Sequence, residues 1–334
     1  MSEPGAPSIA GTATPHQWTI FSCLAWTEDY LRQHSEPNPR LAAQWLLSAA
    51  TGLSRVELFM HCDQPLTSDE RASLRQAVQR RAAGEPLQYI LGRSAFRHLE
   101  LTVKPGVLIP RPETELLVEL VLAAQPKRVL EIGCGSGAIA LSLLQELPGV
   151  YVLATDISPE AWAVTKANAE GLGLADPLRL DVRQDDLATA LLEEPGLLGS
   201  FDVVVSNPPY VPTDELPDLP TEVRLFEPML ALDGGADGLA IYSRLLGQAA
   251  RLLRPGGLLA VELHSPRLAE AARLAEAAGY LDIQTFDDLT GRPRFLTARW
   301  DQASDGLGDP GNRDGLQDDP TRASDDSVEK PFST

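Results

Sequence analysis

The residues Asn207, Pro208, Pro209 and Tyr210 follow an apolar run and carry groups that could do chemistry. Proline lacks a backbone N–H and has a fixed φ, so two prolines in succession must end a strand in a stiff loop. The side-chain oxygen of Asn207 and the carbonyl of Pro208 could each accept one N–H of a planar nitrogen group, and Tyr210 could stack on its flat face. The loop is therefore predicted to hold such a group in one direction.

A second candidate site is the glycine-rich segment 130–140, LEIGCGSGAIA. Its glycines at 133, 135 and 137 would let the backbone approach a ligand closely at a helix N-terminus. Asp156, at the end of the next predicted strand, can accept hydrogen bonds from both hydroxyls of a ribose, and Asp186 could meet an adenine amino group. Because Ala138 completes a G-x-G-x-x-A pattern, a dinucleotide and another adenosine-containing cofactor both remain open.

These residues would be positioned by a domain in which strand and helix alternate from residue 113 onward. Such alternation predicts an α/β fold with a mainly parallel sheet and helices on both faces, as in Rossmann-like domains. In that fold the ligand lies over the carboxyl ends of the strands. The expected strands are 128–133, 151–156, 178–184, 201–207, 258–264, 281–288 and 294–300, and the expected helices are 136–147, 158–173, 238–257 and 267–280.

The chain before this domain has a different pattern. Apolar residues recur at helical spacing in segments 21–33, 41–53 and 73–84, which predicts a small helical domain over 16–87. Segments 89–96 and 99–110 are predicted to be paired strands, within a β-hairpin linker over 88–112. The α/β domain then covers 113–300. Residues 1–15 are expected to be flexible.

Composition limits the function classes. The net charge of −19 argues against a non-specific nucleic-acid surface. Residues 301–334 carry 9 acidic against 3 basic side chains, a net of −6, and are expected to be a disordered acidic tail. No signal or spanning segment is found, so a cytoplasmic protein is expected. The three cysteines are expected to be reduced, and the five histidines lack metal-like spacing and are expected at surface or capping positions.

Four segments occur together in an order that resembles one family. They are LIPRPETELLVE at 108–119, LEIGCGSGAIAL at 130–141, FDVVVSNPPYVP at 201–212 and FEPMLALDGGADGL at 226–239. The set resembles class I S-adenosylmethionine-dependent methyltransferases, and more narrowly the HemK-type protein-glutamine N5-methyltransferases, over about residues 20–300. The resemblance implies methylation of the Gly-Gly-Gln glutamine of peptide-chain release factors, with S-adenosyl-L-methionine as cofactor, no metal, and a helical domain that docks the protein substrate. A monomer is expected.

The resemblance also implies a role for each candidate residue. The segment Gly133, Cys134, Gly135, Ser136 and Gly137 would contact the methionine part of the cofactor, and Glu131 would support the loop or reach the donor's amino group through water. Asp156 would bind the ribose, and Asp186 with Leu187 the adenine. Asn207 and Pro208 would orient the substrate amide, Pro209 would keep the loop stiff, and Tyr210 would cover the amide. No general base is required before transfer.

Some positions depart from the family pattern. Arg97 stands where relatives commonly have an aromatic residue, which leaves a glutamine-covering role for the hairpin in doubt. His264 lies in VELHSPR, which replaces the more usual Glu-Ile-Gly continuation, and Leu187 replaces an aromatic found in some relatives. Arg111 and Glu113 are expected either to shape a wall between the domains or to form a structural ion pair.

Two other functions remain open at this stage. An adenine-N6 methyltransferase acting on DNA or RNA faces the same lone-pair problem, and the same loop would solve it. Such an enzyme is expected to carry a basic groove, which the composition disfavours. The other alternative is a non-catalytic cofactor-binding module that docks on translation factors, which would leave the intact donor and acceptor motifs unexplained.

Overall fold

The computed structural model describes residues 17–301, so the expected flexible N-terminus and acidic tail lie outside the described residues. The helical domain begins with four helices that pack around one apolar core. Side chains at three N-termini form capping boxes, in which Thr19, Ser54 and Thr67 each accept from a backbone N–H three residues on. The prediction of a helical domain agrees with these elements. They are α1 (Ile20–Gln33), α2 (Pro39–Thr51), α3 (Arg55–Met60) and α4 (Ser68–Ala82).

The linker differs from its prediction at its start. Residues 89–91, expected in a strand, belong to the short helix α5 (Leu87–Leu91), which ends at Gly92 in the left-handed region. The hairpin is therefore shorter than expected and pairs β1 (Arg93–Phe96) with β2 (Leu99–Thr102). Tyr89 explains the difference, because its helical placement buries the ring and lets its hydroxyl donate to the carbonyl oxygen of Val107 over 2.6 Å.

A seven-stranded sheet forms the centre of the α/β domain, in the order β5-β4-β3-β6-β7-β9-β8. Strands β5, β4, β3, β6 and β7 pair in parallel, whereas β9 is antiparallel to both β7 and β8. The prediction of a mainly parallel α/β sheet is confirmed. The strands are β3 (Arg128–Ile132), β4 (Tyr151–Asp156), β5 (Leu180–Gln184), β6 (Phe201–Ser206), β7 (Leu253–Glu262), β8 (Tyr280–Asp287) and β9 (Pro293–Trp300).

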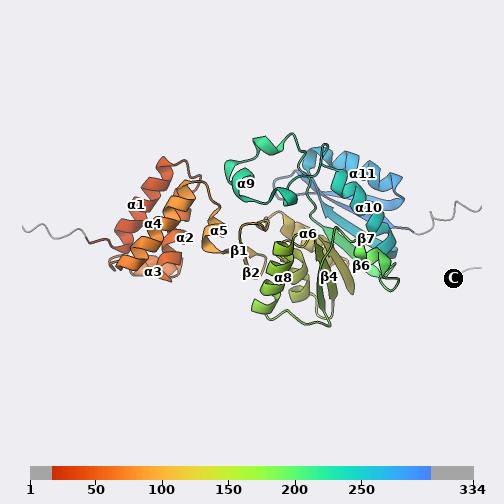
Figure 1. Ribbon diagram of the computed structural model, residues 1–334, viewed down its shortest axis with the longest axis horizontal. Coiled ribbons are helices and arrows are strands. Elements are labelled where there is room, and N and C mark those ends of the chain that lie inside the picture. Colours follow the sequence, from red (N-terminus) through yellow and green to blue (C-terminus); the bar gives the residue numbers. More distant parts are fainter. Residues whose placement is uncertain (1–16, 302–334) are drawn as a thin grey trace, which may run out of the picture. The chain divides into compact units, whose positions relative to one another are not determined.

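Alternate residues of each central strand face opposite helix layers. On β3, Val129 packs in the core with α6 and α7, while its neighbour Leu130 packs in the core with α10 and α11. Figure 1 shows α10 and α11 beside β6 and β7. The helices are α6 (Thr114–Ala123), α7 (Ala138–Glu146), α8 (Pro159–Gly171), α9 (Thr221–Phe226), α10 (Ala240–Leu252) and α11 (Leu268–Ala277), with 3-10 turns η1 (Ala190–Glu193), η2 (Leu216–Asp218), η3 (Met229–Ala231) and η4 (Ser265–Arg267).

This arrangement brings the segments singled out in the sequence to one edge of the sheet. The glycine loop follows β3, Asp156 ends β4, Asp186 follows β5 and Asn207 follows β6. Parallel strands place their carboxyl ends on the same side, so the loops after them meet there. All three cysteines are free, and within residues 17–301 no helix is long and apolar enough to cross a membrane.

Candidate active site

The loop after β3 is held against β4 by its backbone. The N–H groups of Gly133 and Cys134 both donate to the carbonyl oxygen of Thr155, over 2.8 and 2.9 Å. Gly133 and Gly135 have positive φ, and a Cβ atom on either would meet no atom within 4 Å. Gly137 differs, because its Cβ would lie 3.0 Å from both Leu141 and Thr165. The first two glycines thus leave open space for a ligand, while the third lets α7 pack closely.

Asp156 faces this loop. One carboxylate oxygen accepts from the N–H of Gly135 over 2.8 Å, and the other accepts from the N–H of Ser158 over 2.9 Å. Burial raises the pKa of the Asp156 carboxyl, and the two backbone hydrogen bonds act in the opposite direction. Each oxygen keeps lone-pair capacity for another donor, so the carboxylate could accept from a pair of ligand hydroxyls.

A cavity of about 430 Å³ lies over this edge of the sheet and is mostly apolar, with a few acidic groups. Asp186 lines it but also pairs with Arg244, 2.7 Å away, and both side chains are about half exposed. Leu187 has a positive φ of 57° and contributes an apolar wall. The predicted residues that line the cavity are Gly133, Gly135, Asp156, Asp186, Leu187, Asn207 and Pro209.

Four other predicted residues lie beneath this surface. Glu131 is 1% exposed, and its carboxylate accepts from the N–H of Ala140 over 2.8 Å, which fixes the first turn of α7 to β3. Burial raises the pKa of Glu131 well above its usual value. Cys134 and Ser136 are buried as well, and Pro208 is buried between the partly exposed Asn207 and Pro209. These positions support the loops from behind the cavity walls.

Asn207 is held by a chain of hydrogen bonds. Its side-chain Nδ2 donates to Oγ1 of Thr114 over 3.2 Å, and Thr114 donates to Oε2 of Glu262 over 2.7 Å. The hydroxyl of Tyr210 donates to the other oxygen of Glu262 over 3.2 Å. Neither Thr114 nor Glu262 was among the predicted site residues. The threonine of PETE and the glutamate of VELH were the sequence signals available for them.

A second cavity, of about 540 Å³, adjoins the same loop. Its wall includes Asn207, Tyr210, Arg111 and His264, so a histidine expected at a surface or capping position lies at this site. The Tyr210 and His264 rings are nearly parallel, with centroids 6.3 Å apart. Burial lowers the pKa of His264, which favours its neutral form. Asn207, Leu108 and Ala231 line both cavities.

Arg111 forms an ion pair with Glu227 rather than with Glu113. The two charged groups are 2.6 Å apart, and the Glu227 side chain is 2% exposed. Arg111 also lines the second cavity, so both roles considered for it are compatible with its position. Glu113 stands at the N-terminus of α6, where its backbone begins the helix that carries Thr114.

The loop of Asn207 is held in place by the glycine-rich segment before α10. Val211 donates its N–H to the carbonyl of Leu232 over 2.9 Å, and its own carbonyl accepts from Gly234 over 2.8 Å. A Cβ on Gly234 would lie 2.8 Å from Cα of Tyr210, and one on Gly238 would lie 2.5 Å from its carbonyl oxygen. The GGADG segment therefore needs glycine because its backbone presses directly on Tyr210.

The side chain of the hairpin residue Arg97 does not reach either cavity. Its guanidinium pairs with Glu146 of α7 at 2.6 Å and with Glu119 of α6 at 2.7 Å. Its backbone has a φ of 49°, and its N–H donates to Glu115 over 2.9 Å. The Arg97 side chain therefore joins the hairpin to two helices and lines neither cavity.

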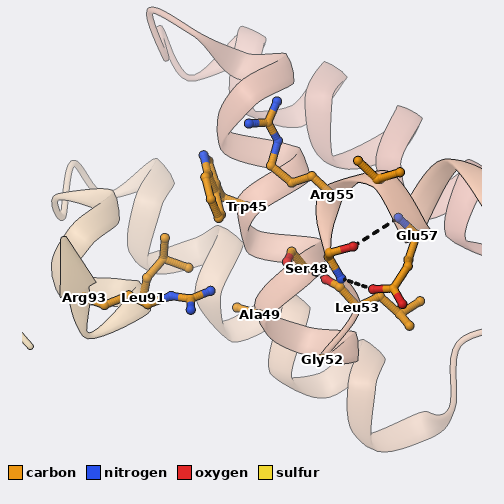
Figure 2. Close-up of a pocket in the computed structure, with 11 residues that line it drawn as sticks. Trp45, Ser48, Ala49, Gly52, Leu53, Arg55, Glu57, Leu91 and Arg93 are labelled. Carbon is orange, nitrogen blue, oxygen red and sulfur yellow. Dashed lines mark hydrogen bonds between the residues drawn. The ribbon is translucent and has the colours of Figure 1, made fainter. Parts of the chain in front are cut away.

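A third pocket lies between helices of the helical domain and the start of the linker, at Leu91 and Arg93. Figure 2 shows Trp45, Arg55 and Glu57 around it, with Arg55 lying over the Trp45 ring at 5.2 Å from its centroid. Arg55 also donates to the side-chain oxygen of Gln44 over 2.9 Å. Among residues 17–301, no cluster of His, Cys, Asp or Glu could hold a metal ion.

The sheet order, the glycine loop and the acidic residues at the end of β4 and after β5 together define a class I methyltransferase domain. Two family models match, the PrmC N-terminal domain over residues 22–92 and the methyltransferase small domain over 111–222. A release factor glutamine methyltransferase of Geobacter sulfurreducens is 42% identical over 290 residues, which cover 86% of this chain and 99% of that protein. One of Moorella thermoacetica is 46% identical over 265 residues, covering 78% and 91%. The chain belongs to the release factor glutamine methyltransferase family.

Proposed function

We propose that this protein transfers a methyl group from S-adenosyl-L-methionine to the side-chain nitrogen, N5, of the glutamine in the Gly-Gly-Gln motif of peptide-chain release factors. The observation that carries the proposal is the position of Asn207, which lines both cavities at the carboxyl edge of the sheet. One cavity would take the methyl donor and the other the glutamine side chain. The family name of its relatives gives the substrate class.

The residues of the first cavity fit S-adenosylmethionine. Gly133 and Gly135 leave room for the methionine part beside the backbone, and the Asp156 carboxylate keeps acceptor capacity for the ribose hydroxyls. Leu187 and the Asp186–Arg244 pair would surround the adenine. When bound, this cofactor supplies an electrophilic methyl group on a positively charged sulfur. Glu131 would act only through the fold of the loop.

The second cavity would orient the substrate. A carboxamide nitrogen is a poor nucleophile because its lone pair is delocalised into the carbonyl. Asn207 Oδ1 and the carbonyl of Pro208 would each accept one N–H of the glutamine, which turns the lone pair toward the donor cavity and favours positive charge on the nitrogen. Pro209 keeps these acceptors in place, and Tyr210 covers the amide and excludes water. The methylated nitrogen then releases a proton to water.

The helical domain would dock the release factor through α3. Val56, Phe59 and Met60 are 70%, 51% and 71% exposed, and the spacing of three and four residues places them on one helix face. Neighbouring exposed apolar side chains on a soluble protein form the kind of patch that often marks a protein interaction site. The pocket with Trp45 and Arg55 is lined in part by the first residues of the same helix, α3 (Figure 2). We propose that this face contacts the folded factor away from its glutamine.

A triple variant tests the docking surface. Val56→Ser, Phe59→Ser and Met60→Ser together should raise KM for the intact release factor and leave methylation of a short Gly-Gly-Gln peptide unchanged. Leu178→Ser and Leu289→Ser form the matched control, because these side chains are 84% and 89% exposed in the α/β domain. An equal effect of both sets on the intact factor would contradict docking through α3.

The function itself is tested by incubating the protein with S-adenosylmethionine and an intact release factor, then mapping the added methyl by mass spectrometry. A mass increase at the Gly-Gly-Gln glutamine, absent when that glutamine is replaced by alanine, supports the proposal. Methylation of adenine in DNA or RNA instead would favour the alternative enzyme, and tight cofactor binding without turnover on either would favour a binding module. The enzyme is proposed to act as a monomer in the cytoplasm, without a nucleic-acid partner.

A further inference from the structure

A buried carboxylate lies behind the proposed substrate site. Glu262, the last residue of β7, is 0% exposed, and both of its oxygens are used. Thr114 donates to one over 2.7 Å, and Tyr210 donates to the other over 3.2 Å. Nη1 of Arg294 lies 4.0 Å away and supplies a positive charge. A carboxylate in this position accepts hydrogen bonds from helix α6 and from the loop after β6 at once.

When Glu262 is ionised, the chain of bonds has a fixed direction. An ionised carboxylate only accepts hydrogen bonds, so the single hydroxyl hydrogen of Thr114 must point to Glu262. Toward Asn207, Thr114 then offers only a lone pair, and the partner atom must be the NH2 end of the Asn207 amide, 3.2 Å away. The carbonyl end of that amide, Oδ1, is consequently turned away from Thr114. The network thus determines which end of Asn207 is available to a ligand.

Burial and the neighbouring groups act on the pKa of Glu262 in opposite directions. Burial raises the pKa of Glu262, and so does the nearby charge of Glu113. The hydrogen bonds from Thr114 and Tyr210 and the charge of Arg294 act in the opposite direction, so the pKa is raised by less than burial alone would raise it. An ionised Glu262 therefore has two hydroxyl donors and one cation to compensate its burial.

We infer that Thr114 and Glu262 are positioning residues for methyl transfer, which hold the Asn207 amide with Oδ1 toward the substrate nitrogen. The inference rests on the proposed function for the identity of that nitrogen. Without the network the amide could rotate by half a turn and present NH2 to the substrate's own NH2, so that two donors would face each other. The bond to Tyr210 lets the same carboxylate hold the ring that covers the substrate.

Thr114→Val is the first test, because it keeps the shape of the side chain and removes the hydroxyl. We expect kcat to fall by about 10- to 100-fold, a part of the usual loss for a preorganised polar contact. Affinity for S-adenosylhomocysteine should be unchanged, since Thr114 lines neither cavity. Thr114→Ser restores the hydroxyl and should recover most of the lost turnover. Failure of the serine variant to recover activity would overturn the positioning role.

A readout without turnover separates this inference from the proposed function. The sequence has four asparagines, Asn38, Asn168, Asn207 and Asn312, so selective ¹⁵N-asparagine labelling gives few side-chain NH2 signals. In the native protein one proton of the Asn207 NH2 should exchange slowly with solvent, and in Thr114→Val it should exchange quickly. Unchanged protection in the valine variant would overturn the inference even if the enzyme methylates release factors.

A double-mutant cycle distinguishes positioning from a general loss of structure. In an Asn207→Ala background, Thr114→Val should cause no further loss of kcat, because the group that it positions is already absent. Independent losses that multiply would mean that Thr114 acts through the fold alone. Glu262→Gln is the second variant. Its NH2 group must face the hydroxyl of either Thr114 or Tyr210, so one of the two hydrogen bonds is lost, and in the Asn207→Ala background it should likewise cause no further loss of kcat. Glu262→Gln with native turnover would refute the role of the carboxylate.

Discussion

Replacing Asn207 by alanine is the most direct test of the site. The change removes the acceptor proposed for the glutamine amide and leaves Gly133, Gly135 and Asp156 unaltered. Thr114 loses one hydrogen bond but keeps its 2.7 Å bond to Glu262, so the cost in the free energy of unfolding should be about 1 kcal/mol. Cofactor affinity should change by less than about tenfold, because Asn207 is one residue of a large cavity wall.

Turnover should fall far more than binding. Deleting one preorganised contact to a developing charge costs about 10²- to 10³-fold in kcat, or about 2.7–4 kcal/mol. Titration calorimetry with S-adenosylhomocysteine measures the binding half, and single-turnover methyl transfer to an intact release factor measures the chemical half. Near-normal transfer by Asn207→Ala would refute the mechanism. A collapse of cofactor binding with no separate chemical defect would place Asn207 in the cofactor site alone.

Asn207→Asp makes a useful comparison. Aspartate keeps an acceptor toward the substrate but presents a second acceptor to Thr114, whose one hydrogen is already donated to Glu262. Its turnover should therefore lie between those of the native protein and Asn207→Ala.

Three other predictions follow from the geometry. Burial raises the pKa of Asp156, so on acidification the affinity for S-adenosylhomocysteine should begin to fall at a pH above about 4, the usual pKa of an aspartate. Asp156→Asn should bind S-adenosylhomocysteine weakly, and its affinity should not change with pH in this range. Gly238→Ala would place its Cβ 2.5 Å from the Tyr210 carbonyl oxygen at a φ of +74°, so both Tm and turnover should fall, whereas Gly247→Ala, in open space on α10, should raise Tm slightly. Arg97→Ala should lower the free energy of unfolding by about 1–3 kcal/mol through its lost carboxylate partners, with kcat and cofactor affinity unchanged in the same assays.

Much of the α/β fold could be predicted because each strand and helix has its own local pattern. The run of apolar residues in β3 identifies a strand buried on both faces, as Val129 and Leu130 show by packing on opposite sides. Local pattern did not predict α5, because its five residues are too few to show helical periodicity. What makes them helical is a distant contact, the bond of Tyr89 to Val107.

The candidate site also contains residues that the local sequence pattern predicts and residues that only the folded chain reveals. Gly133, Gly135, Asp156 and Asn207 could be predicted to lie together, since each lies at the end of a strand or just after one and the ends of parallel strands meet. Thr114 and Glu262 could not, because they are 148 positions apart and only the folded chain shows that they share a hydrogen bond.

Two of the four sequence segments that mark this family meet at the loop carried by a third, 201–212. The segment 108–119 contributes Leu108 to both cavities and Thr114 to the bond with Asn207. The segment 226–239 contributes Ala231 to both cavities and the backbone that presses on Tyr210. A glycine loop alone serves any ligand with an adenosine, but these two segments act on the residues proposed to hold the amide. In the proposed mechanism these two segments therefore help to fix where a planar nitrogen is held relative to the methyl donor.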